Sequence, residues 1–214
     1  MGDDYTFRMI LLVGFLIVIP IGIYHRLRSQ ATREKLERRQ EGLFILLALR
    51  PIGVAGMAGL IAFLINPAWM AWASVPLPVW LRWSGVGIGL IAGSLLTWTF
   101  RSLGKNLTDT VVTRKEHTLV TTGPYRWVRH PFYTSVALAF LANSLAAANG
   151  FLFLTGGLVF MLLVMRTRKE EENLLARFGN EYGKYMKRTG RFVPRLGGQG
   201  ANGSASTSHP PPAG

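Results

Sequence analysis

The sequence predicts an all-α membrane protein, a multi-pass helical bundle of about five transmembrane helices with a cytoplasmic C-terminal helix. Three observations support this fold class. Apolar residues make up 49% of the 214 residues, and the formal net charge is nevertheless +13. The apolar residues also gather in windows that approach the length needed to cross hydrocarbon, which is about 17–25 residues per helix. A soluble domain this basic is seldom so apolar.

Each expected helix is an apolar window poor in charge. The five windows are Met9–Tyr24, Leu43–Ile65, Val79–Phe100, Pro131–Leu145 and Phe151–Met165. Asp3 and Asp4 precede the first window and no small-residue cleavage site follows it, so we expect a retained span rather than a signal peptide. The second contains Arg50-Pro51. The last two are short for full spans, and we expect them to tilt or to form a hairpin.

Basic residues predict the orientation of these spans, because loops retained in the cytoplasm carry excess Lys and Arg. Six basic residues lie in the loop 25–42, six in 101–130 and nine from Arg166 onward, whereas Asn66–Trp80 and Asn143–Gly150 have none. The distribution predicts an integral membrane protein with its N-terminus outside and its C-terminus cytoplasmic. Since topology accounts for the positive charge, we expect the lipid bilayer as a partner and no nucleic acid.

Two kinds of chemistry are disfavoured by composition. The chain has no cysteine, which excludes disulfides, thiolate nucleophiles and Cys-ligated metals. Its histidines number four and are scattered without the spacing of metal ligands. We therefore expect no metal site.

Opposite charges bracket the last hydrophobic hairpin. Arg126, Arg129 and His130 precede a stretch from Pro131 to Met165 that contains no charge, and Glu170-Glu171-Glu172 follow it. Such donors before a helix favour an anionic group such as a carboxylate. The acids oppose the negative end of the helix dipole, so they should have a cationic partner, either neighbouring basic residues or a ligand. S-adenosylmethionine carries a carboxylate, an ammonium and a sulfonium, and it would satisfy both sides.

The order of residues around this bracket resembles the isoprenylcysteine carboxyl methyltransferase (ICMT) family and its phospholipid methyltransferase relatives. The resemblance covers about Arg101 to Pro194, whereas the first hundred residues are similar only in being membrane spans. We therefore divide the chain into three N-terminal spans (1–100), a methyltransferase-like region (101–195) and a disordered tail (196–214). The matching residues are Leu119 to Arg126, Arg129-His130-Pro131, Tyr133, Glu170-Glu171, Leu174, Phe178-Gly179, Tyr182, Tyr185 and Arg191 to Pro194.

The resemblance implies an integral membrane methyltransferase that takes S-adenosylmethionine from the cytosol. Its acceptor would be a lipid-like or small apolar molecule with a carboxylate, amine or thiol. The residues implied in the cofactor pocket are Gly123, Pro124, Tyr125, Arg129, His130, Pro131, Tyr133, Glu170 and Glu171, and the two acids would hold the amino group. Arg191 and Glu171 are the implied catalytic residues, as contact to the acceptor and as proton acceptor for an amine. Phe178, Tyr182 and Tyr185 would lie on a helix covering the pocket.

Departures from the family pattern concern the acceptor. Ser135 stands where relatives often have Gly, and Thr189-Gly190-Arg191 stands where many have Val-Pro-Arg. Two other functions remain open at this stage. One is an NADPH-dependent enzyme similar to sterol reductases, which the acidic pair disfavours. The other is a non-catalytic membrane scaffold.

Overall fold

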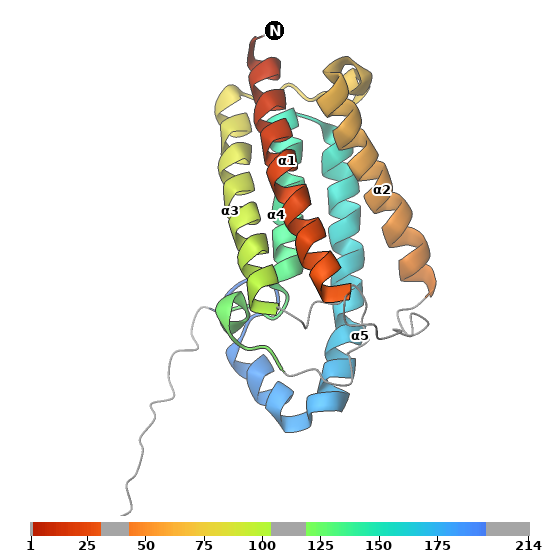
Figure 1. Cartoon of the computed structure of the whole chain (residues 1–214). Helices are drawn as coiled ribbons and strands as arrows, with labels where there is room; N and C mark the ends of the chain where they lie inside the picture. The colour runs from red at the N-terminus through yellow and green to blue at the C-terminus, as the bar shows by residue number, and fades with distance from the viewer. Residues whose placement is uncertain (1, 31–42, 104–118, 196–214) are drawn as a thin grey trace, which may run out of the picture.

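The computed structural model describes residues 2–30, 43–103 and 119–195 (Figure 1). Within these ranges the secondary structure is helical apart from two isolated β-bridges, which confirms the all-α fold class. The predicted tail 196–214 and most of the basic loop 25–42 lie outside the described residues. The elements are α1 (Gly2–Gln30), α2 (Leu43–Ile65), η2 (Pro67–Ala73), α3 (Val79–Leu103), η4 (Gly123–Arg126), α4 (Pro131–Ala147) and α5 (Gly150–Arg188).

Four of the described helices, α1, α2, α3 and α5, are long and apolar enough to cross a membrane. The fifth predicted span, α4, has 17 residues. At 1.5 Å per residue it is about 25 Å long, which is less than the roughly 30 Å of a typical hydrocarbon core. The chain is thus an integral membrane protein with four long helices and one shorter apolar helix packed among them.

The helices pack closely where side chains are small. α3 lies along α4, and a Cβ on Gly85 would come within 2.8 Å of the Ala146 nitrogen. Gly156 of α5 faces the ring of Phe140 on α4 at similarly short range. Gly93 of α3 is packed less tightly than Gly85, since a Cβ there would make only ordinary van der Waals contact with Val18. Small residues therefore fix the α3–α4–α5 core of the bundle.

The hairpin between α4 and α5 turns at the end of the bundle where α1 begins, the upper end in Figure 1. Ala148 ends α4 in the left-handed region, with φ 49°, and its N–H caps the helix through the Leu145 carbonyl. Asn149 caps α5, because its side-chain oxygen accepts a hydrogen bond from the Leu152 N–H at 3.2 Å. The hairpin therefore returns the chain to the lower end.

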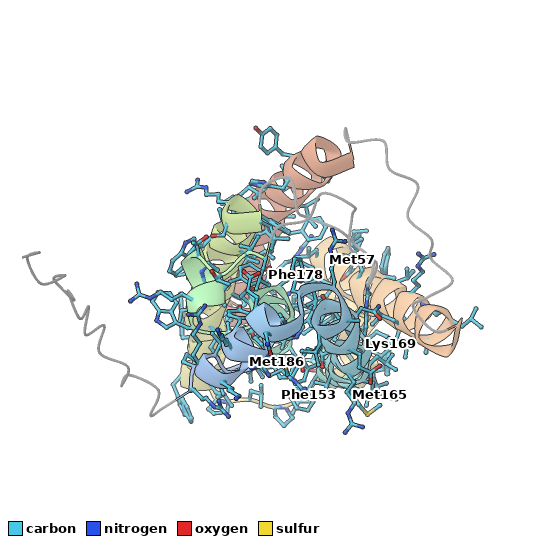
Figure 2. The ribbon with its side chains drawn as sticks, turned by 90° about the horizontal axis from the view of Figure 1, so that it is seen from below. Met57, Phe153, Met165, Lys169, Phe178 and Met186 are labelled. Atoms are coloured by element: carbon cyan, nitrogen blue, oxygen red, sulfur yellow. The ribbon has the colours of Figure 1, made fainter. Side chains whose placement is uncertain are left out.

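α5 extends beyond the other helices at the lower end and then changes direction (Figure 1). The helix has 39 residues, and its apolar part ends before Arg166. Gly179 breaks the helical geometry with φ 50° and ψ −125°, angles that favour glycine. Seen from below (Figure 2), the part of α5 after this kink crosses beneath the bundle, with Phe178 and Met186 near the middle and Lys169 further out. This arrangement brings residues 189–191 back towards the loop before α4.

Candidate active site

The loop before α4 is shaped by one glycine and two prolines. Gly123 has φ +61°, and a Cβ there would collide with the Ser102 side chain of α3. Pro124 is buried at the second position of η4 and Pro131 at the first position of α4, where a fixed φ and a missing N–H suit a helix start. These features hold the loop against α3 and direct the backbone of Arg129 and His130 towards α5.

The C-terminal segment pairs with this loop through the main chain. The Arg129 N–H donates to the Gly190 carbonyl at 2.8 Å, and the His130 N–H donates to the Arg191 carbonyl at 3.0 Å. The Gly190 N–H returns a bond to the Trp127 carbonyl at 3.1 Å. The three bonds form a short parallel bridge between chain segments about sixty residues apart. The bridge places Arg191 beside the charged end of α5.

Glu171 is the centre of the resulting ionic site. Its Oε1 accepts hydrogen bonds from Arg129 Nε at 2.8 Å and Arg191 Nε at 3.2 Å, and it lies 3.2 Å from His130 Nε2. Arg191 Nη2 bonds the second oxygen, Oε2. The Glu171 residue is 5% exposed. We call Glu171 with Arg129, His130 and Arg191 the Glu171 cluster.

This arrangement determines the charge of Glu171. Burial alone would raise the pKa of the Glu171 carboxyl, but the hydrogen bonds from His130, Arg191 and Arg129 outweigh it and hold that pKa well below its ordinary value. Arg129 is fixed further by donating through Nη1 to the carbonyls of Met186 at 3.1 Å and Thr189 at 2.5 Å. Glu171 is therefore a structural anion with its bonding capacity largely filled.

Glu170 has a different environment from its neighbour. Its Oε2 accepts a hydrogen bond from the Tyr133 hydroxyl at 2.8 Å and lies 3.9 Å from His130 Nδ1. The Glu170 side chain remains 26% exposed, against 5% for Glu171. The Tyr133 and His130 rings stack at 5.4 Å with an interplanar angle of 2°. Glu170 thus combines a fixed position with an accessible carboxylate.

The structure brings most of the predicted site residues together at the lower end. The loop residues lie against the C-terminal part of α5, and the Tyr125 carbonyl accepts a hydrogen bond from the Tyr185 hydroxyl at 2.7 Å. Burial, assisted by the charge of Glu170, raises the pKa of Tyr125 well above its ordinary value, so its hydroxyl stays protonated. The described members are Gly123, Pro124, Tyr125, Arg129, His130, Pro131, Tyr133, Glu170, Glu171 and Arg191.

Two residues of the charged bracket do not join the site. Glu172 is exposed and pairs with Lys169 at 3.4 Å. Arg126 is also exposed, and its guanidinium lies 5.8 Å from the centre of the Trp127 ring.

Thr189 belongs to the site although the sequence gives no sign of it. It is 2% exposed, its carbonyl accepts a hydrogen bond from Arg129, and its hydroxyl donates to the Tyr185 carbonyl at 2.6 Å. Among the described residues, no group of three or more His, Cys, Asp or Glu could hold a metal ion.

A known protein family matches the part of the chain that holds most of these residues. The sequence profile of the isoprenylcysteine carboxyl methyltransferase (ICMT) family matches residues 85–176, a range that contains the loop before α4, the hairpin and the acidic pair. Over this range the chain is similar to the ICMT family.

Relatives within and around the ICMT family differ in what their names say they act on. The protein-S-isoprenylcysteine O-methyltransferase of Rattus norvegicus is 29% identical over 152 residues, which are 68% of this chain and 51% of that protein. Methanethiol S-methyltransferase 2 of Bradyrhizobium diazoefficiens is 25% identical over 210 residues, or 91% of this chain and 77% of that protein. The chain spans about half the length of the curated mammalian relatives it matches.

The fold of the ICMT family is shared as well. The solved structure of the eukaryotic intramembrane Ras methyltransferase ICMT superposes with a TM-score of 0.52 at 19% sequence identity, over 88% of this chain and 67% of that chain. Together with the four long apolar helices, this likeness supports an integral membrane protein.

Proposed function

We propose that this chain is an integral membrane methyltransferase that uses S-adenosylmethionine and methylates a lipid-like or small apolar acceptor at the cytoplasmic membrane face. The observation that carries the proposal is the meeting of Glu170 and Glu171 with Arg129, His130 and Tyr133 at one end of an apolar hairpin. The family and the names of the relatives support the reaction class. The cytoplasmic orientation follows from the distribution of basic residues.

The residues present fit this cofactor. Glu170 is the acid we propose to hold the methionyl ammonium, because its carboxylate is accessible and Tyr133 fixes its position. The Glu171 carboxylate is already occupied by three cationic or ring donors, so its role is to position Arg129 and His130 rather than to bind the amino group alone. Gly123, Pro124, Tyr125 and Pro131 would form the remaining wall. The Tyr133 ring lies beside His130 and offers an aromatic surface to a cation.

When bound, S-adenosylmethionine would supply a methyl group on a sulfonium: the lone pair of the acceptor would bond to the methyl carbon in line as the carbon–sulfur bond breaks, with S-adenosylhomocysteine as the leaving group. The protein contributes by holding the two reactants aligned, which can supply several kcal/mol of the barrier reduction. The helices around the site exclude competing water. Arg191, whose side chain is 38% exposed, is the residue we propose to orient the polar group of the acceptor.

The state of Glu171 favours acceptors that need no general base. A carboxylate whose pKa is held well below its ordinary value is a weak proton acceptor near neutral pH. An ammonium acceptor would have to lose a proton, whereas a carboxylate is already ionised and a thiol is partly ionised. We therefore propose a carboxylate or a small apolar thiol before an amine, as the names of the rat and Bradyrhizobium relatives also suggest.

Calorimetric titration of the detergent-purified protein with S-adenosylmethionine tests the proposal. Glu170→Gln should weaken binding at least about tenfold, equal to about 1.4 kcal/mol. Glu172→Gln removes the same charge two residues later at an exposed position and should leave binding unchanged. A folded parent that binds NADPH instead would indicate the reductase function, and one that binds neither cofactor would indicate a scaffold.

A further inference from the structure

A polar cavity lies at the end of the bundle opposite the Glu171 cluster, the upper end in Figure 1. Its volume is about 370 Å³, and its walls come from the start of α1, the ends of α2 and η2, the first turn of α3 and the α4–α5 hairpin. Asp4, Met70, Arg82 and Asn149 are among the lining residues. We call it the Arg82 cavity. It shares no residue with the Glu171 cluster, so methyl transfer does not explain it.

Hydrogen bonds hold the walls of the Arg82 cavity in place. The Asn149 side-chain amide donates to the Met70 carbonyl at 3.1 Å, and the Val75 N–H donates to the Ala148 carbonyl at 2.8 Å. These bonds tie η2 and the segment after it to the α4–α5 hairpin. Asn149 is 3% exposed and its side-chain oxygen caps α5. Hydrogen bonds between its walls therefore define the shape of the cavity.

Arg82 is an unusual residue for its position. It lies in the first turn of α3, where the helix dipole disfavours a cation, and the residue is 7% exposed. Its Nε donates to the Ala146 carbonyl at 3.1 Å, its Nη1 donates to Asp4 Oδ1 at 2.7 Å, and its guanidinium stacks over the Phe7 ring at 4.1 Å. Its Nη2 has no hydrogen-bond acceptor among the described residues. A buried charged donor without an acceptor is unfavourable. An anionic oxygen of a ligand would satisfy this nitrogen.

Asp4 supplies the opposite charge at the same cavity. Its side chain is 64% exposed, although one oxygen pairs with Arg82. A ligand that suits both residues has an anionic oxygen for the guanidinium and an ammonium with N–H donors for the carboxylate. Trp72 on η2 and Trp80 on α3 are 71% and 70% exposed at this end, and such indole rings favour the headgroup zone of a bilayer. The cavity therefore lies at the depth where lipid headgroups are found.

We propose that the Arg82 cavity binds the phosphoethanolamine headgroup of a membrane lipid. A phosphate oxygen accepts from Arg82 Nη2, and the primary ammonium donates to Asp4. Phosphatidylcholine fits less well because its quaternary ammonium has no N–H donor. Phosphatidylglycerol has no ammonium group to pair with Asp4, so its phosphate and the Asp4 carboxylate would repel each other. Free phosphoethanolamine has the same polar chemistry but lacks the acyl chains that membrane placement supplies.

Binding of short-chain lipids to the delipidated 214-residue protein in detergent, measured by native mass spectrometry, tests this. Dihexanoyl phosphatidylethanolamine should bind about tenfold more tightly than the matching choline and glycerol lipids, and more tightly than free phosphoethanolamine. Asp4→Asn, at an exposed position, should remove the preference for ethanolamine over choline. Arg82→Lys should weaken all three lipids.

Two controls separate this site from its surroundings. Arg8→Lys changes a second arginine at the same end, which donates to the Leu64 and Ile65 carbonyls and does not line the cavity, and it should keep the preference. Glu170→Gln should keep it too, because the proposal is independent of methyl-donor binding. Equal binding of the three lipids, or a preference that survives Asp4→Asn, would overturn the proposal. If free phosphoethanolamine bound as tightly as dihexanoyl phosphatidylethanolamine, the ligand of the cavity would be a soluble molecule and not a lipid.

Discussion

Arg129 Nε lies 2.8 Å from Glu171 Oε1 although the two residues are 42 positions apart in the chain. The contact joins the loop before α4 to the charged end of α5 across the whole apolar hairpin. Arg129 is at the same time bonded to the carbonyls of Met186 and Thr189. One side chain therefore fixes the loop, the acidic pair and the end of α5 relative to one another.

Glu171→Gln should destabilise the protein strongly. The change leaves Arg129 and Arg191 buried or half-buried without their carboxylate, and removing one partner of a buried ionic pair typically costs about 3–5 kcal/mol. Thermal unfolding in detergent should show a lower Tm. Glu172→Gln is the matched control: its exposed pair with Lys169 is worth at most about 1 kcal/mol. A parent-like Tm for Glu171→Gln would mean that the cluster is not a source of stability.

The same carboxylate predicts how stability depends on pH. The pKa of Glu171 is lower in the folded protein than its ordinary value, which is about 4.3 for a glutamate in an unfolded chain. Its contribution is therefore fully present above that ordinary pKa and is lost as the pH falls from about 5 towards the folded pKa. Unfolding of the parent at decreasing pH should show this loss. Glu171→Gln should flatten that part of the curve, and an equally steep curve in the variant would assign the acid sensitivity to other groups.

The charged residues of the site could be predicted from the sequence, but one of the bonds between them could not. Arg129, His130, Glu170 and Glu171 are recognisable because charges at both ends of an uninterrupted apolar hairpin must meet at one membrane face. The bond between Arg191 and Glu171 has no such signal, since it depends on the main-chain bridge of Gly190 to the loop. That bridge is made by main-chain N–H and C=O groups, which do not depend on the side chain, so the sequence does not indicate where it forms.

The register of the acidic run was equally hidden. Successive residues of a helix point about 100° apart, so Glu170, Glu171 and Glu172 cannot all face one site, and only the packed structure shows that Glu172 faces outward. The length of α4, in contrast, was close to the prediction: the window Pro131–Leu145 ends within the last turn of the helix, which continues to Ala147. The sequence did not indicate that Ala148 ends the helix by adopting the left-handed conformation.

Two neighbouring tyrosines should respond differently to loss of the hydroxyl. Tyr185 donates to the Tyr125 carbonyl at 2.7 Å, so Tyr185→Phe leaves that carbonyl without its donor and should cost about 1–3 kcal/mol. The Tyr182 hydroxyl is buried and has no hydrogen-bond partner among the described residues. Tyr182→Phe should therefore change the Tm little. The two variants remove the same atom from rings 5.8 Å apart, and equal losses would show that the hydroxyl of Tyr182 is bonded in solution.

The kink in α5 should depend on the backbone of Gly179 and not on the space around it. A Cβ there would meet nothing within 4 Å, but the residue has φ +50° and ψ −125°, and a side chain held in such a sparsely populated backbone region costs roughly 1–3 kcal/mol. Gly179→Ala should lower the Tm and weaken cofactor binding, because a straightened α5 would move Met186, Thr189 and Arg191 away from Arg129 and Glu171. Gly183→Ala is the control, since Gly183 also has open space but lies in the helical part after the kink. There alanine should be neutral or stabilising by up to about 1 kcal/mol. If both substitutions behaved alike in unfolding and in calorimetric titration, the turn at Gly179 would not be what returns the chain to the site.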